Sequence, residues 1–230
     1  MSFKKILIAA LVTAATLPMA GAHANTITFT TAQSEFTPDT LNQGWWAAGV
    51  ANSTTNDNHI TGTYSNREYR SFYTFDLTNI TGTVKSASLL IQAGNITGNN
   101  IKLNLWDVTT AANIVNNNAA ANAAVFADLG SGNSYGSYTL AAANSKNKYL
   151  TLDLNTQAFN DIGTANGFFT IGATAFSAQS NYIFGATSGD VTRLIVEFAD
   201  APVNKVPEPA SLGLLLAGIG GLVAARRRKQ

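Results

Sequence analysis

The three tryptophans, Trp45, Trp46 and Trp106, are the side chains of this chain best suited to holding a ligand. An aromatic face attracts the C–H groups of a sugar ring, so exposed tryptophans are common in carbohydrate sites. Because neighbouring residues of a strand face opposite sides of a sheet, we expect at most one of Trp45 and Trp46 in the core. Trp106 is expected on the polar face of its strand, either facing solvent or covered by a following loop. Ordinary packing at a sandwich edge is the simpler alternative for Trp45 and Trp46, and cover by the loop is the simpler one for Trp106.

Two polar segments offer weaker possibilities. The segment 52–59 is rich in oxygen ligands of the kind that calcium binds, but Asp57 is its only charged ligand, and a solvated loop is the simpler interpretation. Arg67, Glu68 and Arg70 form a charged group that can clamp an anionic sugar, because arginine binds carboxylates through two hydrogen bonds. An ion pair on a strand face is the plainer alternative for these three residues.

Composition excludes several classes of site. The chain has no cysteine, and the region 25–204 contains one histidine, His59. Soft-ligand metal centres are therefore disfavoured, and a Ser-His-Asp site would depend on His59 alone. The region 25–204 has seven basic and twelve acidic residues, a formal net charge of −5 that does not suit nucleic-acid binding. None of the twelve acids is marked by spacing as a catalytic pair, and no cofactor is predicted.

The first 24 residues have the pattern of a signal peptide. Lys4 and Lys5 precede an apolar run over 6–17, and Ala22 and Ala24 fit the small-x-small rule of a signal peptidase site. We therefore expect the export machinery and signal peptidase as partners, and a mature chain that begins after residue 24.

The region 205–230 has three parts in a fixed order. These are the tetrapeptide Val206, Pro207, Glu208 and Pro209, an apolar run over 210–225, and the basic cluster Arg226, Arg227, Arg228 and Lys229. The prolines hold the backbone extended, as a processing peptidase requires. The apolar run would be about 24 Å long as a helix, shorter than a hydrocarbon core of about 30 Å, which suits a temporary anchor. The basic cluster is expected on the cytoplasmic side.

This three-part arrangement resembles the PEP-CTERM sorting signal of bacterial exported proteins. The resemblance implies recognition and processing by an exosortase. It also implies an exported protein that is anchored transiently in the inner membrane and then reaches the cell surface or the extracellular matrix.

We predict that the region 25–204 is a single, mainly β domain. Strands are expected over residues 26–30, 45–50, 68–77, 84–92, 101–108, 134–141, 148–154, 167–173, 181–186 and 192–198, where apolar residues alternate or cluster. The Ala- and Asn-rich stretch 109–127 is expected to be a long loop with a helical turn that covers one sheet edge. Asn155 is a good N-cap for a short helix over 156–162, closed by Gly163. The predicted fold is an antiparallel β-sandwich of jelly-roll type.

A second, less specific resemblance reaches into this domain. The segments 70–77, 80–89, 127–132, 135–138 and 171–173 are similar to a pattern repeated in exported PEP-CTERM proteins. It implies a secreted β-sandwich resembling carbohydrate-binding modules. We therefore predict a non-catalytic structural or glycan-associated role in the exopolysaccharide or biofilm matrix. The alternative is a polysaccharide lyase or hydrolase of jelly-roll type, whose acids would line a groove.

Overall fold

The computed structural model describes residues 25–199 apart from 33–34, 37–40, 51–56, 79, 81, 118–119, 143–146, 177–180 and 186–189. Twelve strands and three helices are described in this part of the chain. They are β1 (Asn25–Thr30), β2 (Gln43–Ala47), β3 (His59–Tyr64), β4 (Arg67–Asp76), β5 (Val84–Ala93), β6 (Asn95–Thr97), β7 (Ile101–Asp107), α1 (Ala112–Val115), α2 (Ala123–Asp128), β8 (Ser134–Leu140), β9 (Lys148–Asp153), α4 (Thr156–Thr164), β10 (Phe168–Phe176), β11 (Tyr182–Gly185) and β12 (Arg193–Phe198). The domain is therefore mainly β, as the alternating pattern predicts.

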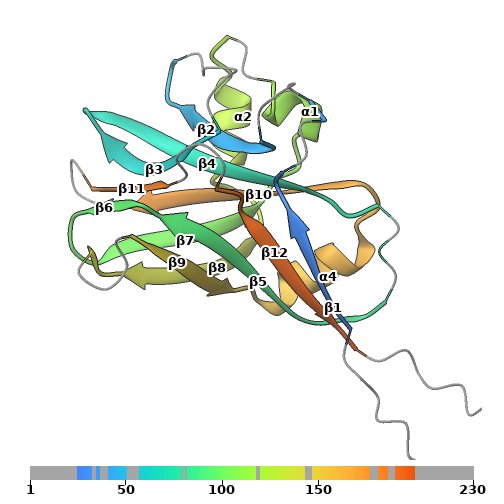
Figure 1. Ribbon diagram of the computed structural model, residues 1–230. Coiled ribbons are helices and arrows are strands. Elements are labelled where there is room, and N and C mark those ends of the chain that lie inside the picture. Colours follow the sequence, from blue (N-terminus) through green and yellow to red (C-terminus); the bar gives the residue numbers. More distant parts are fainter. Residues whose placement is uncertain are drawn as a thin grey trace, which may run out of the picture. The chain divides into compact units, whose positions relative to one another are not determined.

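The strands form two antiparallel sheets (Figure 1). The smaller sheet has the order β1-β12-β5-β9. The larger sheet has eight strands in the order β6-β11-β3-β4-β10-β7-β8, with β2 paired to β4 beside this path. In Figure 1, α1 and α2 lie on one side of β4 and β10, and the four-stranded sheet lies on the other.

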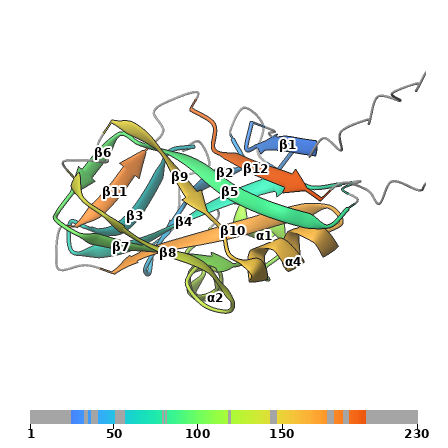
Figure 2. The ribbon, with the colours of Figure 1, turned by 90° about the horizontal axis from the view of Figure 1, so that it is seen from below.

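Strand β4 is the branch point of the larger sheet. Ser71 pairs with Trp45 of β2 and with Ala173 of β10. Tyr69 pairs with β2 as well, and with Gly62 of β3. β2 therefore occupies one edge of β4, while β3 and β10 share the other edge one after the other. The first part of β4 pairs with β3 and the later part pairs with β10. β3, β11 and β6 therefore turn away from β10, β7 and β8, and the sheet curls into a half-barrel (Figure 2).

The two sheets meet where one strand passes from the first to the second. Ala93, at the end of β5, pairs with Lys148 in the four-stranded sheet. After Gly94, Asn95 of β6 pairs with Phe184 in the eight-stranded sheet. Strands that change sheet in this way form the corners of β folds. The main core fills the space between the sheets with the inward faces of β4, β5, β7, β10 and β12, and α4 adds two fully buried residues.

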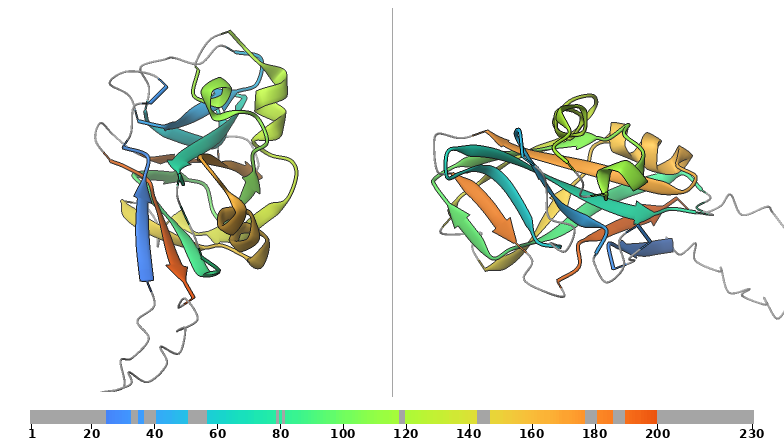
Figure 3. Two further views of the ribbon diagram at one scale, coloured as in Figure 1. Left: turned by 90° about the vertical axis from the view of Figure 1, so that its right-hand side faces the viewer. Right: turned by 90° about the horizontal axis from the view of Figure 1, so that it is seen from above.

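A second, smaller core lies on the outer face of the larger sheet. Trp46 and Phe72 project from β2 and β4 and meet Val115, Val125 and Leu129 from the α1–α2 region. The Trp46 indole N–H donates a hydrogen bond of 2.9 Å to the Val115 carbonyl. The stretch 109–127 therefore contains two short helices that cover a sheet face, where the sequence predicted a loop with a helical turn over a sheet edge (Figure 3).

The antiparallel, mainly β class is thus confirmed, and its larger sheet is a curled half-barrel; a jelly-roll sandwich is not confirmed. The short helix predicted over 156–162 is present, and the Asn155 side chain caps it by accepting from the Ala158 N–H at 3.1 Å. The helix continues through Gly163 to Thr164, so the prediction that Gly163 closes it is wrong.

The sequence prediction missed β3 and β6. The segments expected at the two ends of the chain, 1–24 and 205–230, lie outside the described residues, and so does the apolar run 210–225. Within the described ranges, no helix is long and apolar enough to cross a membrane.

Candidate functional site: an aromatic row on the curled sheet

Four aromatic side chains share one face where the larger sheet curls. Tyr69 pairs with Gly62, and Gly62 pairs with Tyr182, so the two tyrosines lie across three adjacent strands on one face. Tyr64 is two residues beyond Gly62 and projects from the same face. Trp45 pairs with Ser71, two residues after Tyr69 on β4, so its side chain lies on the same face as Tyr69. We call these four residues, Trp45, Tyr69, Tyr64 and Tyr182, the aromatic row.

The rings of the aromatic row contact one another in sequence. The ring centroids of Trp45 and Tyr69 are 5.1 Å apart, those of Tyr69 and Tyr64 6.4 Å, and those of Tyr64 and Tyr182 5.1 Å. The first and last pairs are edge-to-face, which is a favourable geometry for aromatic rings. Tyr64 is 46% exposed and the other three are partly exposed, so the row presents ring faces and edges to solvent.

The local backbone explains how the row forms. Ser65 and Asn66 both have positive φ, 48° and 60°, which is the geometry of a two-residue type I′ turn that joins β3 to β4. Gly62 has a φ of +117°, and a Cβ atom there would collide with the backbone carbonyl of Asn181. Only glycine therefore permits the close approach of β11, which brings Tyr182 beside Tyr64.

A depression of about 260 Å³ lies at the Tyr182 end of the row. Its lining residues are Ile60, Tyr64, Asn95, Tyr182 and Phe184. Two phenol hydroxyls and one carboxamide supply its side-chain polar groups, and the Asn95 Nδ2 group donates to the Tyr182 hydroxyl at 3.4 Å. None of the lining residues carries a charge at neutral pH. Apolar faces with a few neutral hydrogen-bonding groups are typical of small-ligand sites.

The tryptophans predicted as glycan contacts have different environments. Trp46 is 2% exposed and belongs to the smaller core, so it cannot contact a ligand. Trp45 is partly exposed and forms one end of the aromatic row, which agrees with the expectation that at most one of the adjacent pair is buried. Trp106 is partly buried, and its indole N–H donates 2.8 Å to the Thr174 hydroxyl on the neighbouring strand. Trp106 is not part of the aromatic row.

The polar candidates contribute little to this site. Asp57 accepts a hydrogen bond from Gln43 through its backbone carbonyl at 2.8 Å, and most of its segment, 51–56, is not described. No group of three His, Asp or Glu side chains able to hold a metal ion occurs among the described residues, so the calcium site stays a prediction. His59 is 1% exposed, and burial lowers its pKa to about 4.

Arg70 and Glu68 form the strand-face ion pair that was the plainer alternative. The Arg70 Nε lies 2.9 Å from a Glu68 carboxylate oxygen. Its Nη1 also donates to the carbonyls of Phe126 and Ala127, and its guanidinium carbon lies 4.2 Å from the centre of the Phe126 ring. Arg70 therefore fastens α2 to β4. The Arg67 side chain, by contrast, is exposed and makes no hydrogen bond or ion pair to any other described residue.

Sequence reasoning missed the tyrosines and Phe184, which make up most of the site. Tyr64 and Tyr69 flank a two-residue turn, and this hairpin was the signal available in the sequence. Tyr182 is more than 100 residues away along the chain and reaches the row only through the pairing of β11 with β3.

Comparison with known proteins bears on the C-terminal region. Residues 205–229 match the family model described as the PEP-CTERM protein-sorting motif. The match covers Pro207, Glu208, Pro209 and the basic cluster, and it supports exosortase as the enzyme that processes this protein. It indicates an exported protein that is held transiently at the membrane before it reaches the surface. No curated protein matches the chain.

Proposed function

We propose that this protein is a non-catalytic component of the exopolysaccharide or biofilm matrix that holds polysaccharide on its aromatic row. The observation that carries the proposal is the continuous contact of Trp45, Tyr69, Tyr64 and Tyr182 beside an uncharged depression. A pyranose ring has an apolar C–H face and a rim of hydroxyls, so it complements ring faces that are bordered by phenol hydroxyls and a carboxamide.

The place of the row in the domain suits a matrix role. Asn25, at the start of β1, pairs with Phe198, at the end of β12, so the chain enters and leaves the domain at one corner. Strand β5 starts at this corner, where Val84 pairs with Phe198, and leads to β6 at the other end, beside Tyr182. The aromatic row thus lies at the end of the domain away from the connections to both terminal segments (Figure 1). A large ligand can approach the row without meeting these connections.

The alternative, a polysaccharide-active enzyme, has less support at the two depressions described. Hydrolysis requires one carboxyl group that keeps its proton near neutral pH, which means a raised pKa. Asp153 and Glu197 line one depression on the four-stranded sheet, but Glu197 is paired with Lys85 at 2.7 Å, which lowers the pKa of Glu197. A carboxyl group held in its ionised form cannot donate the proton to a leaving group. Burial also keeps His59, the only histidine described, away from any substrate.

Binding of the exported protein, purified from the producing cells, to the exopolysaccharide of those cells tests the proposal. We expect saturable binding with no change in polymer length by size-exclusion chromatography. Tyr64→Ala and Tyr182→Ala should each weaken binding about tenfold, the loss of about 1.4 kcal/mol typical of a contact residue. Tyr149→Ala is the matched control, because Tyr149 is 49% exposed, close to the 46% of Tyr64, but lies on β9 outside the row.

Two results would contradict the proposal. Shortening of the polymer by the wild-type protein would identify an enzyme. Equal binding by Tyr64→Ala and Tyr149→Ala would show that the aromatic row is not the binding site.

A further inference from the structure

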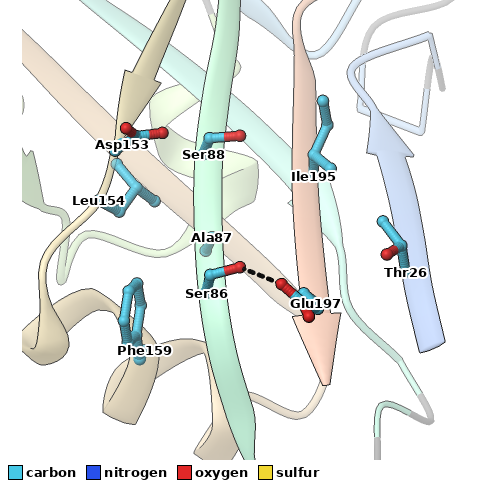
Figure 4. A pocket seen from close by; sticks show the side chains of 9 residues that line it. All are labelled: Thr26, Ser86, Ala87, Ser88, Asp153, Leu154, Phe159, Ile195 and Glu197. Atoms are coloured by element: carbon cyan, nitrogen blue, oxygen red, sulfur yellow. Dashed lines mark hydrogen bonds between the residues drawn. The ribbon is translucent and has the colours of Figure 1, made fainter. Parts of the chain in front are cut away.

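We infer that the domain has a second sugar-binding site on the outer face of the four-stranded sheet, so that one molecule can bridge two polysaccharide segments. This inference rests on the proposed function of the aromatic row. The site is a depression of about 310 Å³, which we call the serine shelf (Figure 4). The residues that supply its chemistry are Thr26, Ser86, Ser88, Asp153, Phe159 and Glu197.

Strand register places these residues side by side on the outward face. Ser88 of β5 pairs with Asp153 of β9, and Ser86 of β5 pairs with Glu197 of β12. Glu197 in turn pairs with Thr26 of β1, so the shelf crosses all four strands. The alternate residues of β5 and β12 face the main core and are buried, so the shelf side chains point to solvent.

The shelf has the chemical composition of a sugar site. Phe159 of α4 is partly buried and forms the wall beside β9 and β5 (Figure 4), where its ring can pack against a pyranose face. The hydroxyls of Thr26 and Ser88 can donate and accept hydrogen bonds, and the Ser86 hydroxyl, which donates to Glu197, can still accept one. A carboxylate with two free oxygens can accept from two neighbouring sugar hydroxyls.

Asp153 is the group left free for that role. The Glu197 carboxylate is already occupied, since Lys85 and the Ser86 hydroxyl lie 2.7 Å and 2.8 Å from its two oxygens. The Asp153 side chain is exposed and accepts no hydrogen bond from any other described residue; only its backbone carbonyl is engaged, by the Tyr138 hydroxyl. Lys85 neutralises Glu197, so Asp153 is the carboxylate of the shelf lining whose charge is not paired with another described residue. This single negative charge disfavours uronic acids, and the shelf suits uncharged sugars.

The serine shelf and the aromatic row are separate sites. From Ser88 to Asn95 the chain follows β5 and β6 for seven residues, which is about 20 Å at the usual strand rise. The two sites also belong to different sheets. A protein with two such sites links two segments of polymer, and the second contact strengthens attachment because it forms at high effective concentration.

Residue-resolved NMR titration of the exported protein with neutral, amino-sugar and uronate oligosaccharides locates the sites directly. We expect neutral oligosaccharides to shift the amides of 86–88 and 153–159. Asp153→Asn should weaken this binding about tenfold, as the loss of a charge-assisted hydrogen bond predicts. Glu35→Gln is the control, because it removes one exposed negative charge outside both depressions.

The bridging is tested by the viscosity of the producing cells' exopolysaccharide mixed with the protein. The wild-type protein should raise the viscosity, and Asp153→Asn should bind polymer through the aromatic row without raising it. Shifts confined to the aromatic row, or undiminished bridging by Asp153→Asn, would overturn the serine shelf and leave the proposed function standing. Shifts at neither site would overturn both.

Discussion

His59 is a buried imidazole whose ring nitrogens make no hydrogen bond of good geometry within the described residues, although the Gln92 backbone interacts with the ring and favours its charged form. Its ring packs edge-on against Tyr73, with centroids 5.5 Å apart, in the interior of the curled sheet. Burial lowers its pKa from 6.5 to about 4, and the backbone of Gln92 opposes the shift. Between these two pH values the unfolded state therefore binds a proton that the folded state does not bind.

This difference makes the domain less stable as the pH falls. Stability due to neutral His59 is complete above pH 6.5 and is lost as the pH falls toward 4, by about 3 kcal/mol in total for a shift of this size. His59→Leu removes the titrating group while it keeps an apolar side chain of similar size. Urea unfolding at several pH values should show that the wild-type free energy of unfolding falls about 3 kcal/mol more than that of the variant. Parallel curves for the two proteins would contradict the assignment.

Arg67 is the cation available at the rim of the aromatic row. It pairs with Tyr64 across the β3–β4 hairpin, whereas Arg70 is occupied by Glu68 and α2. We expect Arg67→Gln to weaken binding of a uronate-containing polymer about fivefold at low salt, as suits one exposed charge pair. Binding of the same polymer after its carboxyl groups are reduced should not change. Lys102→Gln is the control, since Lys102 is an exposed cation on β7, and equal losses in both variants would indicate only a general charge effect.

At the scale of elements, Gly172 determines how closely the α1–α2 region approaches the larger sheet. A Cβ atom at Gly172 would lie 2.9 Å from the Cα of Leu129, so Gly172→Ala must push the end of α2 away from β10. Because Leu129 belongs to the smaller core around Trp46, we expect the free energy of unfolding to fall by about 2 kcal/mol. Urea denaturation measures this change.

Gly163 provides a control of opposite sign. It lies inside α4, and a Cβ atom there would meet its nearest neighbour at 3.7 Å, an ordinary contact. Gly163→Ala should therefore stabilise the domain by up to about 1 kcal/mol through helix propensity. A Gly172→Ala variant as stable as the wild-type protein would contradict close packing of α2 on Gly172.

The elements also show what local patterns can predict. The alternation of Ile101, Leu103 and Leu105 predicts β7, and Asn155 predicts the start of α4, because each signal is complete within a few residues. Strand β3 escaped prediction because Gly62 interrupts its pattern, and its partner β11 is distant in sequence. The curl of the larger sheet depends on β3 and β10, which pair with the same edge of β4. No local sequence pattern indicates that two strands share this edge.

The candidate site could be predicted even less well than the fold, because it too depends on pairing between strands that are distant in sequence. Trp45 was singled out by residue type, but the row and the serine shelf exist only because strand pairings bring distant residues together. By contrast, the sorting motif is a linear signal that functions through its own sequence, so it could be read from residues 206–229 directly and matches the family model there.

At the scale of the whole molecule, the sorting motif and the β domain should be separable functions. Pairing of Asn25 with Phe198 means that the chain segments leading to both ends start at one corner, while the aromatic row lies at the other end of the domain. Substitutions in the sorting motif should therefore alter delivery of the protein without altering sugar binding. Substitutions in the aromatic row should weaken sugar binding without altering delivery.

A crossed experiment in the producing cells tests this separation. Glu208→Ala changes the charged residue between Pro207 and Pro209, in the segment matched as the sorting motif. We expect this variant to stay in the membrane fraction at its unprocessed size, and to bind exopolysaccharide normally after detergent extraction. Tyr64→Ala should leave the membrane like the wild-type protein, but a larger share of it should appear in the medium instead of the matrix, because the loss of the exposed ring weakens binding by the aromatic row. Normal release of Glu208→Ala would contradict exosortase processing at this motif, and normal matrix retention of Tyr64→Ala would contradict polysaccharide binding by the row.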